Sequence, residues 1–238
     1  MTVPLARRVL WTYGWQLLVL AAVALAPVLL IALRAPVPAD AAVAKTVSKL
    51  AWPMIAFAVV GQLMLAGAAA VHARAIGTRV RTLRTFGAAA LQLARAVIPC
   101  LVALAAVAIG GMALVLPGVA LFVLLSLTAA SPELGEPLPA PLVDSIAIVR
   151  TRLAAVAIVL AAMIAVDVAI VIVAQRLFTV PISKAPTVHE LASYRLVLRV
   201  AAVALVAISP VPACALAVIR NGDGAQLVNQ RRASVRIR

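Results

Sequence analysis

Long apolar runs separated by short charged segments dominate the chain. A helix needs about 20 apolar residues to cross the roughly 30 Å hydrocarbon core of a bilayer. Runs near this length recur along the sequence, and they predict helices rather than strands. The predicted spans cover residues 15–33, 51–71, 97–114, 117–131, 153–174 and 200–219. We therefore expect an all-α, polytopic membrane protein with about six transmembrane helices in one domain, residues 1–220, followed by a basic tail, residues 221–238.

The uncharged stretch 97–130 decides how many crossings are predicted. It is too long for one ordinary span and short for two. Pro117 and Gly118 interrupt it, and proline removes a helical donor and clashes with the preceding turn. We therefore expect a helix break at Pro117-Gly118 and two short spans that form a tight hairpin.

The basic residues test this count, because cytoplasmic loops of membrane proteins carry an excess of Lys and Arg. Six spans with a cytoplasmic N-terminus place fourteen basic residues inside and seven outside. One span in place of the hairpin makes the division eleven against ten. The pattern favours six spans, with both termini in the cytoplasm.

Two segments between spans have one apolar and one polar face. In residues 78–96, Val80 and Leu83 lie opposite Arg81 and Arg84 at helical spacing. Residues 141–151 show the same pattern. We expect both to be interfacial helices on the cytoplasmic membrane surface, with simple extensions of the following spans as the alternative.

Composition excludes a water-soluble fold. Hydrophobic residues make up 66% of the chain, whereas about 45–50% is usual. The net charge of +14 would suggest nucleic acid in a soluble protein, but no basic stretch is interleaved with stacking aromatic residues. We expect no nucleic-acid binding, and contact with anionic lipid or a partner instead. The residues predicted for that contact are Arg79, Arg81, Arg84, Arg95, Arg231, Arg232, Arg236 and Arg238.

Cysteine and histidine give no sign of a metal, a catalytic site or another cofactor. Cys100 and Cys214 lie in apolar runs, with no paired cysteine motif and no histidine at ligand spacing. We expect buried, inert thiols. His72 and Tyr13 fall near the ends of predicted spans, and both rings are expected at the membrane interface.

Asp167 is the acidic residue that lies deep within a predicted span. A carboxylate near the bilayer centre costs at least about 2.5–3.5 kcal/mol, so its side chain should face protein or water. Gln62 and Ser209 lie at similar depth, and Pro210 and Pro212 break the last span and free its backbone carbonyl groups. The sequence leaves two interpretations open: interhelical hydrogen bonds worth about 0.6–2 kcal/mol, or a site for a proton or a substrate.

The order of features in the middle of the chain resembles a known family. A basic segment (79–95) precedes an apolar span, Leu116-Pro117-Gly118, an acidic loop and a short helix that contains Ser145. Residues 67–152 resemble the YciC-like family and the related membrane domain that accompanies some glycerophosphodiester phosphodiesterases. The large residues after Ser145 are Ile148 and Val149, without the aromatic residue of that family. The resemblance implies a six-span protein of the bacterial inner (plasma) membrane, and it implies no reaction.

Three hypotheses for function remain after these observations. The Ala- and Val-rich spans carry few polar groups, which favours a non-enzymatic membrane module: a scaffold, a lipid-interacting protein or a subunit of a larger complex. The alternative is a transporter resembling the permease half of a type-2 ABC exporter, in which residues 79–95 couple to a cytoplasmic ATPase. An intramembrane enzyme that acts on lipid is the third hypothesis.

Overall fold

The computed structural model describes residues 2–36, 38, 40–76, 82–131, 134, 136–179 and 188–221. All regular secondary structure in these residues is helical, as predicted. The elements are α1 (Thr2–Ala24), α2 (Ala26–Arg34), α3 (Ala41–Lys49), α4 (Ala51–Ala75), α5 (Thr82–Ala113), α6 (Val115–Leu125), the 3₁₀ turn η1 (Thr128–Ala130), α7 (Ala140–Thr151), α8 (Leu153–Phe178) and α9 (Val188–Ile208). A last helical segment covers residues 210–221.

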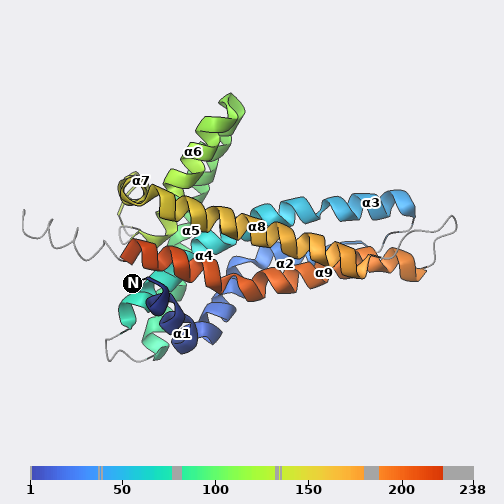
Figure 1. Ribbon diagram of the computed structural model, residues 1–238, viewed down its shortest axis with the longest axis horizontal. Helices are drawn as coiled ribbons and strands as arrows, with labels where there is room; N and C mark the ends of the chain where they lie inside the picture. The colour runs from blue at the N-terminus through green and yellow to red at the C-terminus, as the bar shows by residue number, and fades with distance from the viewer. Residues whose placement is uncertain are drawn as a thin grey trace, which may run out of the picture.

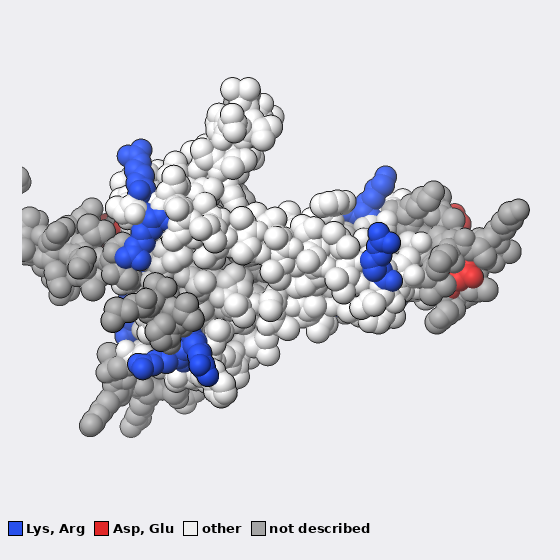
Figure 2. Space-filling view, in the orientation of Figure 1, with Lys and Arg blue, Asp and Glu red and all other residues white. Residues whose placement is uncertain are grey.

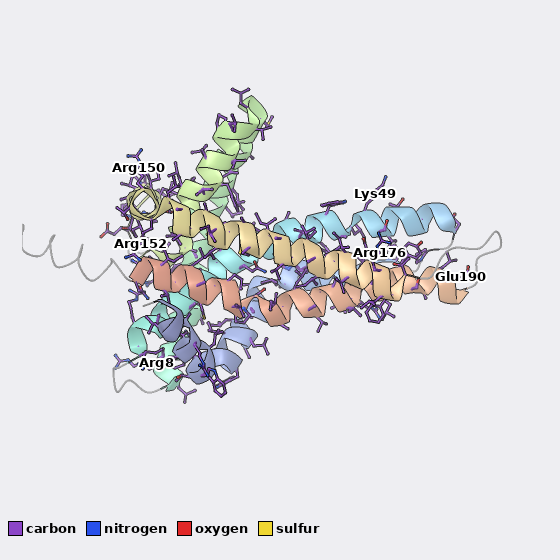
Figure 3. The ribbon with its side chains drawn as sticks, in the orientation of Figure 1. Arg8, Lys49, Arg150, Arg152, Arg176 and Glu190 are labelled. Carbon is purple, nitrogen blue, oxygen red and sulfur yellow. The ribbon has the colours of Figure 1, made fainter. Side chains whose placement is uncertain are left out.

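The helices form an elongated bundle (Figure 1), and the coloured charged side chains gather toward its two ends in the view of Figure 2. Arg8, Arg150 and Arg152 lie at one end, and Lys49 and Arg176 lie at the other (Figure 3). The surface between them is almost free of charged residues in this view (Figure 2). The labelled basic residues predicted for the inside and for the outside therefore lie toward opposite ends of the long axis.

Four helical segments in the described residues are long and apolar enough to cross a membrane. They are Thr46–Ala75, Leu83–Met112, Leu153–Phe178 and Glu190–Asn221, and the bent pair α1–α2 is a candidate fifth. Together with the composition, these segments indicate a membrane protein. Six crossings remain a prediction, because the apolar helix Val115–Ala130 is shorter.

The first predicted span, residues 15–33, is broken rather than straight. Helices α1 and α2 meet at Leu25 with a bend of 60°. Pro27 lies in the first turn of α2 and has no backbone N–H, so the carbonyl group of Val23 loses its helical donor. The bend redirects the chain near the middle of this apolar run.

Residues 82–113 form one continuous helix, so the separate interfacial helix predicted over residues 78–96 is wrong for its described part. Helix α5 contains both the basic segment and the predicted span 97–114. Ala, Leu and Gln favour helix throughout residues 88–96, and no turn residue ends the helix there. The alternative, an extension of the following span, is what the structure has. Arg79 and Arg81 lie outside the described residues.

The break after α5 falls at Leu114, so its predicted position at Pro117-Gly118 is wrong. Leu114 has an extended backbone (φ −161°, ψ 145°), and α6 begins at the next residue. Pro117 and Gly118 are helical, because a proline in the first turn of a helix removes a donor that has no partner in any case. The predicted hairpin is present with its turn moved toward the N-terminus.

Glycine lets the two helices of this hairpin touch. A Cβ atom on Gly118 would lie 2.6 Å from Gly111 Cα, and one on Gly110 would lie 2.8 Å from Leu121 Cδ1. Small residues allow helix backbones to approach closely in this way. The hairpin stands away from the bundle, and α6 runs across its long axis (Figure 1).

The last apolar run is interrupted where the sequence places Pro210 and Pro212. Helix α9 ends at Ile208, Ser209 is a turn residue, and helix resumes at residue 210. Bonds from Ser209 N to Leu205 O (3.1 Å) and from Ala213 N to Ser209 O (3.4 Å) preserve the direction of the helix. The interruption is local, and residues 190–221 still form one long apolar segment.

Helix α7 is a separate element, as predicted for residues 141–151. Arg152 leaves helical geometry (φ −134°, ψ 32°) and divides α7 from α8. The view along the short axis shows α7 nearly end-on, so it lies across α8 at the Arg150 end (Figure 1). Its placement on a membrane surface remains a prediction.

The buried apolar side chains form two main cores. The first core, at the Arg8 end, joins α1, α4, α5, α8 and residues 210–221, with Leu17, Leu65 and Leu216 among its members. The second core, at the Lys49 end, joins α2, α3, α4, α8 and α9 around Met54 and Leu198. Cys100 and Cys214 are buried free thiols, as expected.

Gly67 provides a test of the packing between α4 and η1. A Cβ atom on Gly67 would overlap the carbonyl oxygen of Ala129, so we expect Gly67→Ala to lower stability by about 1–3 kcal/mol. Gly87→Ala is the matched control, because among the described residues no atom outside its own helical backbone and chain neighbours lies within 4 Å of its Cβ position, and alanine favours helix. Thermal unfolding in detergent, followed by circular dichroism, measures both. Equal stability of the two variants would contradict the packing described.

Candidate intramembrane polar site

Twelve polar or charged residues are buried among those the structure describes. They are Gln16, Gln62, His72, Thr85, Ser126, Thr128, Ser131, Ser145, Asp167, Ser193, Ser209 and Arg220. Several of them form three groups, which lie at the middle of the bundle, between α1 and α4, and at the end of α6. Only the middle group contains a buried carboxyl group.

The structure brings together the three residues that the sequence placed at similar depth. Gln62 Nε2 donates to Asp167 Oδ1 at 2.9 Å and to Ser209 Oγ at 3.3 Å. Ser209 Oγ donates to the carbonyl oxygen of Leu205 at 2.5 Å. The exposed fractions of Gln62, Asp167 and Ser209 are 0%, 1% and 0%. We call these three residues the central polar cluster.

Helical periodicity turns Asp167 into the bundle. Leu160, Met163 and Val171 lie three or four residues apart on the same face of α8 and are buried, whereas Val166 and Val173 are exposed. Met163 belongs to the first core and Val171 to the second. The central polar cluster therefore lies where the two cores meet.

The central polar cluster has more hydrogen-bond acceptors than donors. Gln62 has two amide hydrogens, and the bonds to Asp167 and Ser209 use both. Gln62 Oε1 and Asp167 Oδ2 are buried and have no hydrogen-bond partner in the described part of the chain. A buried polar atom without a partner costs about 1–3 kcal/mol, so the visible bonds do not account for the whole cluster.

A second polar group, which the sequence analysis missed, joins α1 to α4. His72 Nδ1 lies 2.9 Å from the carbonyl oxygen of Ala68, and His72 Nε2 lies 2.8 Å from Gln16 Oε1. The ring of Tyr13 meets the His72 ring edge-on, with their centres 4.6 Å apart. Exposed fractions of 0% for His72 and 5% for Tyr13 show that protein covers both rings, so the exposure to headgroups expected of them is wrong.

The reason for this error lies in how α1 packs. Tyr13 and Gln16 are three residues apart and share one helical face, which is the signal the sequence contained. Their position at the start of an apolar run made exposure to headgroups the simpler interpretation. The α1–α4 contact covers them instead, and both nitrogens of His72 are occupied by protein oxygens. This arrangement fits a structural connection better than a catalytic base.

The third group fastens the end of α6 to α5 and α7. Ser145 Oγ donates to the carbonyl oxygen of Leu124 at 2.8 Å and accepts from Leu127 N at 3.2 Å. Ser131 Oγ donates to Asp144 Oδ2 at 2.7 Å, and Gln92 Nε2 donates to the carbonyl oxygen of Ser131 at 3.0 Å. The bond to Leu124 satisfies one of the carbonyl groups that the C-terminal end of α6 leaves without a helical partner. Ser145, one of the residues of the family resemblance, thus has a structural role.

The predicted contacts with anionic lipid are only partly described. Arg84 and Arg95 are exposed on α5. Arg231, Arg232, Arg236 and Arg238 lie outside the described residues, like Arg79 and Arg81. Among the residues that the structure describes, no group of three or more His, Cys, Asp or Glu side chains could hold a metal ion.

Comparisons with known proteins identify no relative of this chain. No family model, no curated protein and no solved structure matches the chain. The resemblance to the YciC-like family therefore remains a prediction from the sequence.

The α1–α4 connection yields a prediction for Gln16. Gln16→Leu removes the oxygen beside His72 Nε2 and leaves that buried nitrogen without its partner. We expect a loss of about 1–3 kcal/mol in stability, measured by thermal unfolding in detergent. Thr12→Leu is the control, because Thr12 is exposed on the same helix. If both variants unfold like the parent chain, the Gln16–His72 contact does not stabilise the fold.

Proposed function

We propose that this chain is a non-enzymatic integral membrane module of the bacterial inner membrane, which acts through contact with lipid or with another membrane protein. A scaffold, a lipid-interacting protein and a subunit of a larger membrane complex all fit this description. The observation that supports it is the α5–α6 hairpin, which extends sideways from the bundle (Figure 1).

The tip of the hairpin is apolar and exposed. The exposed fractions are 87% for Met112, 75% for Val115 and 82% for Leu116. In the space-filling view, the projection carries no charged side chain (Figure 2). An exposed apolar surface of this kind marks contact with a membrane or a protein partner. Where the hairpin leaves the bundle, an apolar groove is lined by residues that include Leu63, Leu104, Val107 and Phe122.

The dimensions of α6 bear on the topology. Its 11 residues rise about 16 Å, whereas the hydrocarbon core is about 30 Å thick. In our proposal the hairpin enters the membrane from the cytoplasmic side and returns to it, and the chain crosses four times, through α1–α2, α4, α8 and residues 190–221. Six crossings, with α5 and α6 both spanning, are the alternative.

The division of basic residues is the same in both topologies. A hairpin that returns and a hairpin that crosses twice both begin and end on one side. Fourteen basic residues therefore remain inside and seven outside, and both termini are cytoplasmic. Charge alone does not distinguish the two topologies, so the position of the hairpin tip must be measured.

Labelling of Leu116→Cys with a membrane-impermeant maleimide on intact cells measures that position. We expect no labelling, because a tip held within the bilayer is shielded from the aqueous reagent. Lys49→Cys should be labelled as the outer control, and Arg150→Cys should be labelled only after the membrane is opened. The parent chain, whose Cys100 and Cys214 are buried, gives the background. Labelling of Leu116→Cys in intact cells would instead support six crossings.

A transporter is the second candidate, and helix breaks favour it. The bend at Leu25 and the interruption at Ser209 both lie beside the central polar cluster. Many transporters build a substrate or ion site near the bilayer midplane from discontinuous helices. The resemblance to a type-2 ABC exporter half is weaker, since the basic segment from Thr82 onward continues into α5 and is no separate coupling helix.

Co-purification in mild detergent tests the proposed function. We expect bound lipid or a membrane-protein partner to co-purify with the parent chain. The double variant Met112→Ala with Leu116→Ala should reduce the amount that co-purifies, because truncation removes exposed contact area. Ile158→Ala with Ile172→Ala on the exposed face of α8 is the matched control and should retain the partner.

Two outcomes would contradict this assignment. If the two double variants retain equal amounts of the co-purifying lipid or partner, the hairpin tip is not the contact surface. A co-purifying ATPase that is lost on Arg84→Ala would favour the transporter instead.

A further inference from the structure

The two oxygens without a donor belong to side chains that are already joined. Gln62 Nε2 bonds to Asp167 Oδ1, and Gln62 Oε1 and Asp167 Oδ2 are the atoms left over. Both atoms can only accept while the carboxyl group is ionised. One hydrogen on Asp167 Oδ2 converts that oxygen into a donor, and Gln62 Oε1 is the acceptor that still lacks one. A single proton can therefore supply what both atoms lack.

Among the residues that the structure describes, no basic side chain makes an ion pair with Asp167. Along the helices, His72 lies about 15 Å from Gln62, Arg176 about 13 Å from Asp167, and Arg199 about 15 Å from Ser209. The bond from Gln62 is the contact that the structure shows for the Asp167 carboxyl group. The other titratable groups on the helical segments packed against α8 are Arg74, Asp144, Arg150, His189, Glu190, Tyr194, Arg195, Cys214 and Arg220.

An ionised Asp167 would thus be a buried charge with one hydrogen bond and no opposite charge beside it in the described part of the chain, and such a charge is strongly destabilising. The missing group must bring one positive charge and one hydrogen-bond donor to the cluster. A proton does both and needs no additional volume at a site whose three side chains are buried. An alkali cation brings the charge alone, and it needs a cavity and further oxygen ligands.

We propose that Asp167 is a proton-binding site within the membrane domain, where the proton resides on Oδ2 and is shared with Gln62 Oε1. This site is independent of any contact between the α5–α6 hairpin and lipid or a partner. Proton binding gives the central polar cluster a chemical role beyond that of interhelical hydrogen bonds.

The position of this site connects it to both interruptions of the bundle. A Cβ atom on Gly61, the neighbour of Gln62, would lie 2.7 Å from Leu25 Cδ1 and 2.9 Å from the carbonyl oxygen of Ala24. The bend between α1 and α2 therefore packs directly against α4 beside the cluster. Ser209, at the interruption of residues 190–221, accepts from Gln62. Loss of the proton places a negative charge between the two cores, where both interrupted helices meet.

Infrared spectroscopy of the purified full chain in lipid nanodiscs tests the proposal. At neutral pH we expect the carbonyl stretch of a protonated carboxyl group in the parent chain. This band should disappear in Asp167→Asn and persist in Glu136→Gln, whose parent side chain is exposed. Absence of the band from the parent chain, or its persistence in Asp167→Asn, would overturn the proposal.

A second measurement uses the same variants and separates a proton from a cation. Asp167→Asn replaces the proposed O–H donor with an N–H donor, so the variant should fold and unfold at the same temperature as the parent near neutral pH. The parent should lose thermal stability as the pH rises and its carboxyl group ionises, whereas Asp167→Asn should not. Replacement of sodium by choline should change neither protein. Sodium-dependent stability of the parent without the infrared band would assign the site to an alkali cation and refute the proton.

Discussion

Within hydrocarbon, every backbone N–H and C=O group must find its hydrogen-bond partner inside the protein, because no water is present to replace one. For a chain with this apolar composition, the constraint accounts for the helical secondary structure of the described residues, and it makes each interruption of a helix costly in free energy. The apolar segments are nevertheless interrupted at Leu25, Leu114 and Ser209. The arrangement of the rest of the molecule follows from how these three interruptions are accommodated.

Each interruption has its own surroundings. At Leu25, the bend packs against Gly61 at a distance that only glycine permits. At Ser209, the side-chain hydroxyl donates to Leu205 O and accepts from Gln62, which links the interruption to Asp167. At Leu114, the chain turns at an exposed apolar tip, and the backbone at the far end of α6 is satisfied by Ser145 instead. Two of the three interruptions therefore meet at the central polar cluster, and the third forms the hairpin.

The apolar runs predicted the helical fold, and the carboxyl group within one of them predicted the central polar cluster. A carboxyl group in an apolar run needs a partner, and helical rise places Gln62 and Ser209 at the depth of Asp167. The position of the hairpin turn and the burial of His72 were not predictable in this way. Apolar periodicity does not say which helices cross, so it could not show that α1 covers His72 or that α6 leaves the bundle. Pro117 indicated a break nearby, but a proline is also tolerated in the first turn of the next helix, so it did not fix the position of the break.

The Gln62–Asp167 bond joins the two cores where the interrupted helices meet. A double-mutant cycle tests it most directly: the stabilities of Gln62→Leu, Asp167→Leu and the double variant are compared with that of the parent chain by reversible unfolding in detergent. Interhelical hydrogen bonds in membranes contribute about 0.6–2 kcal/mol, and we predict a coupling energy of at least this size. A coupling energy of zero, with the two single effects simply adding, would contradict the account.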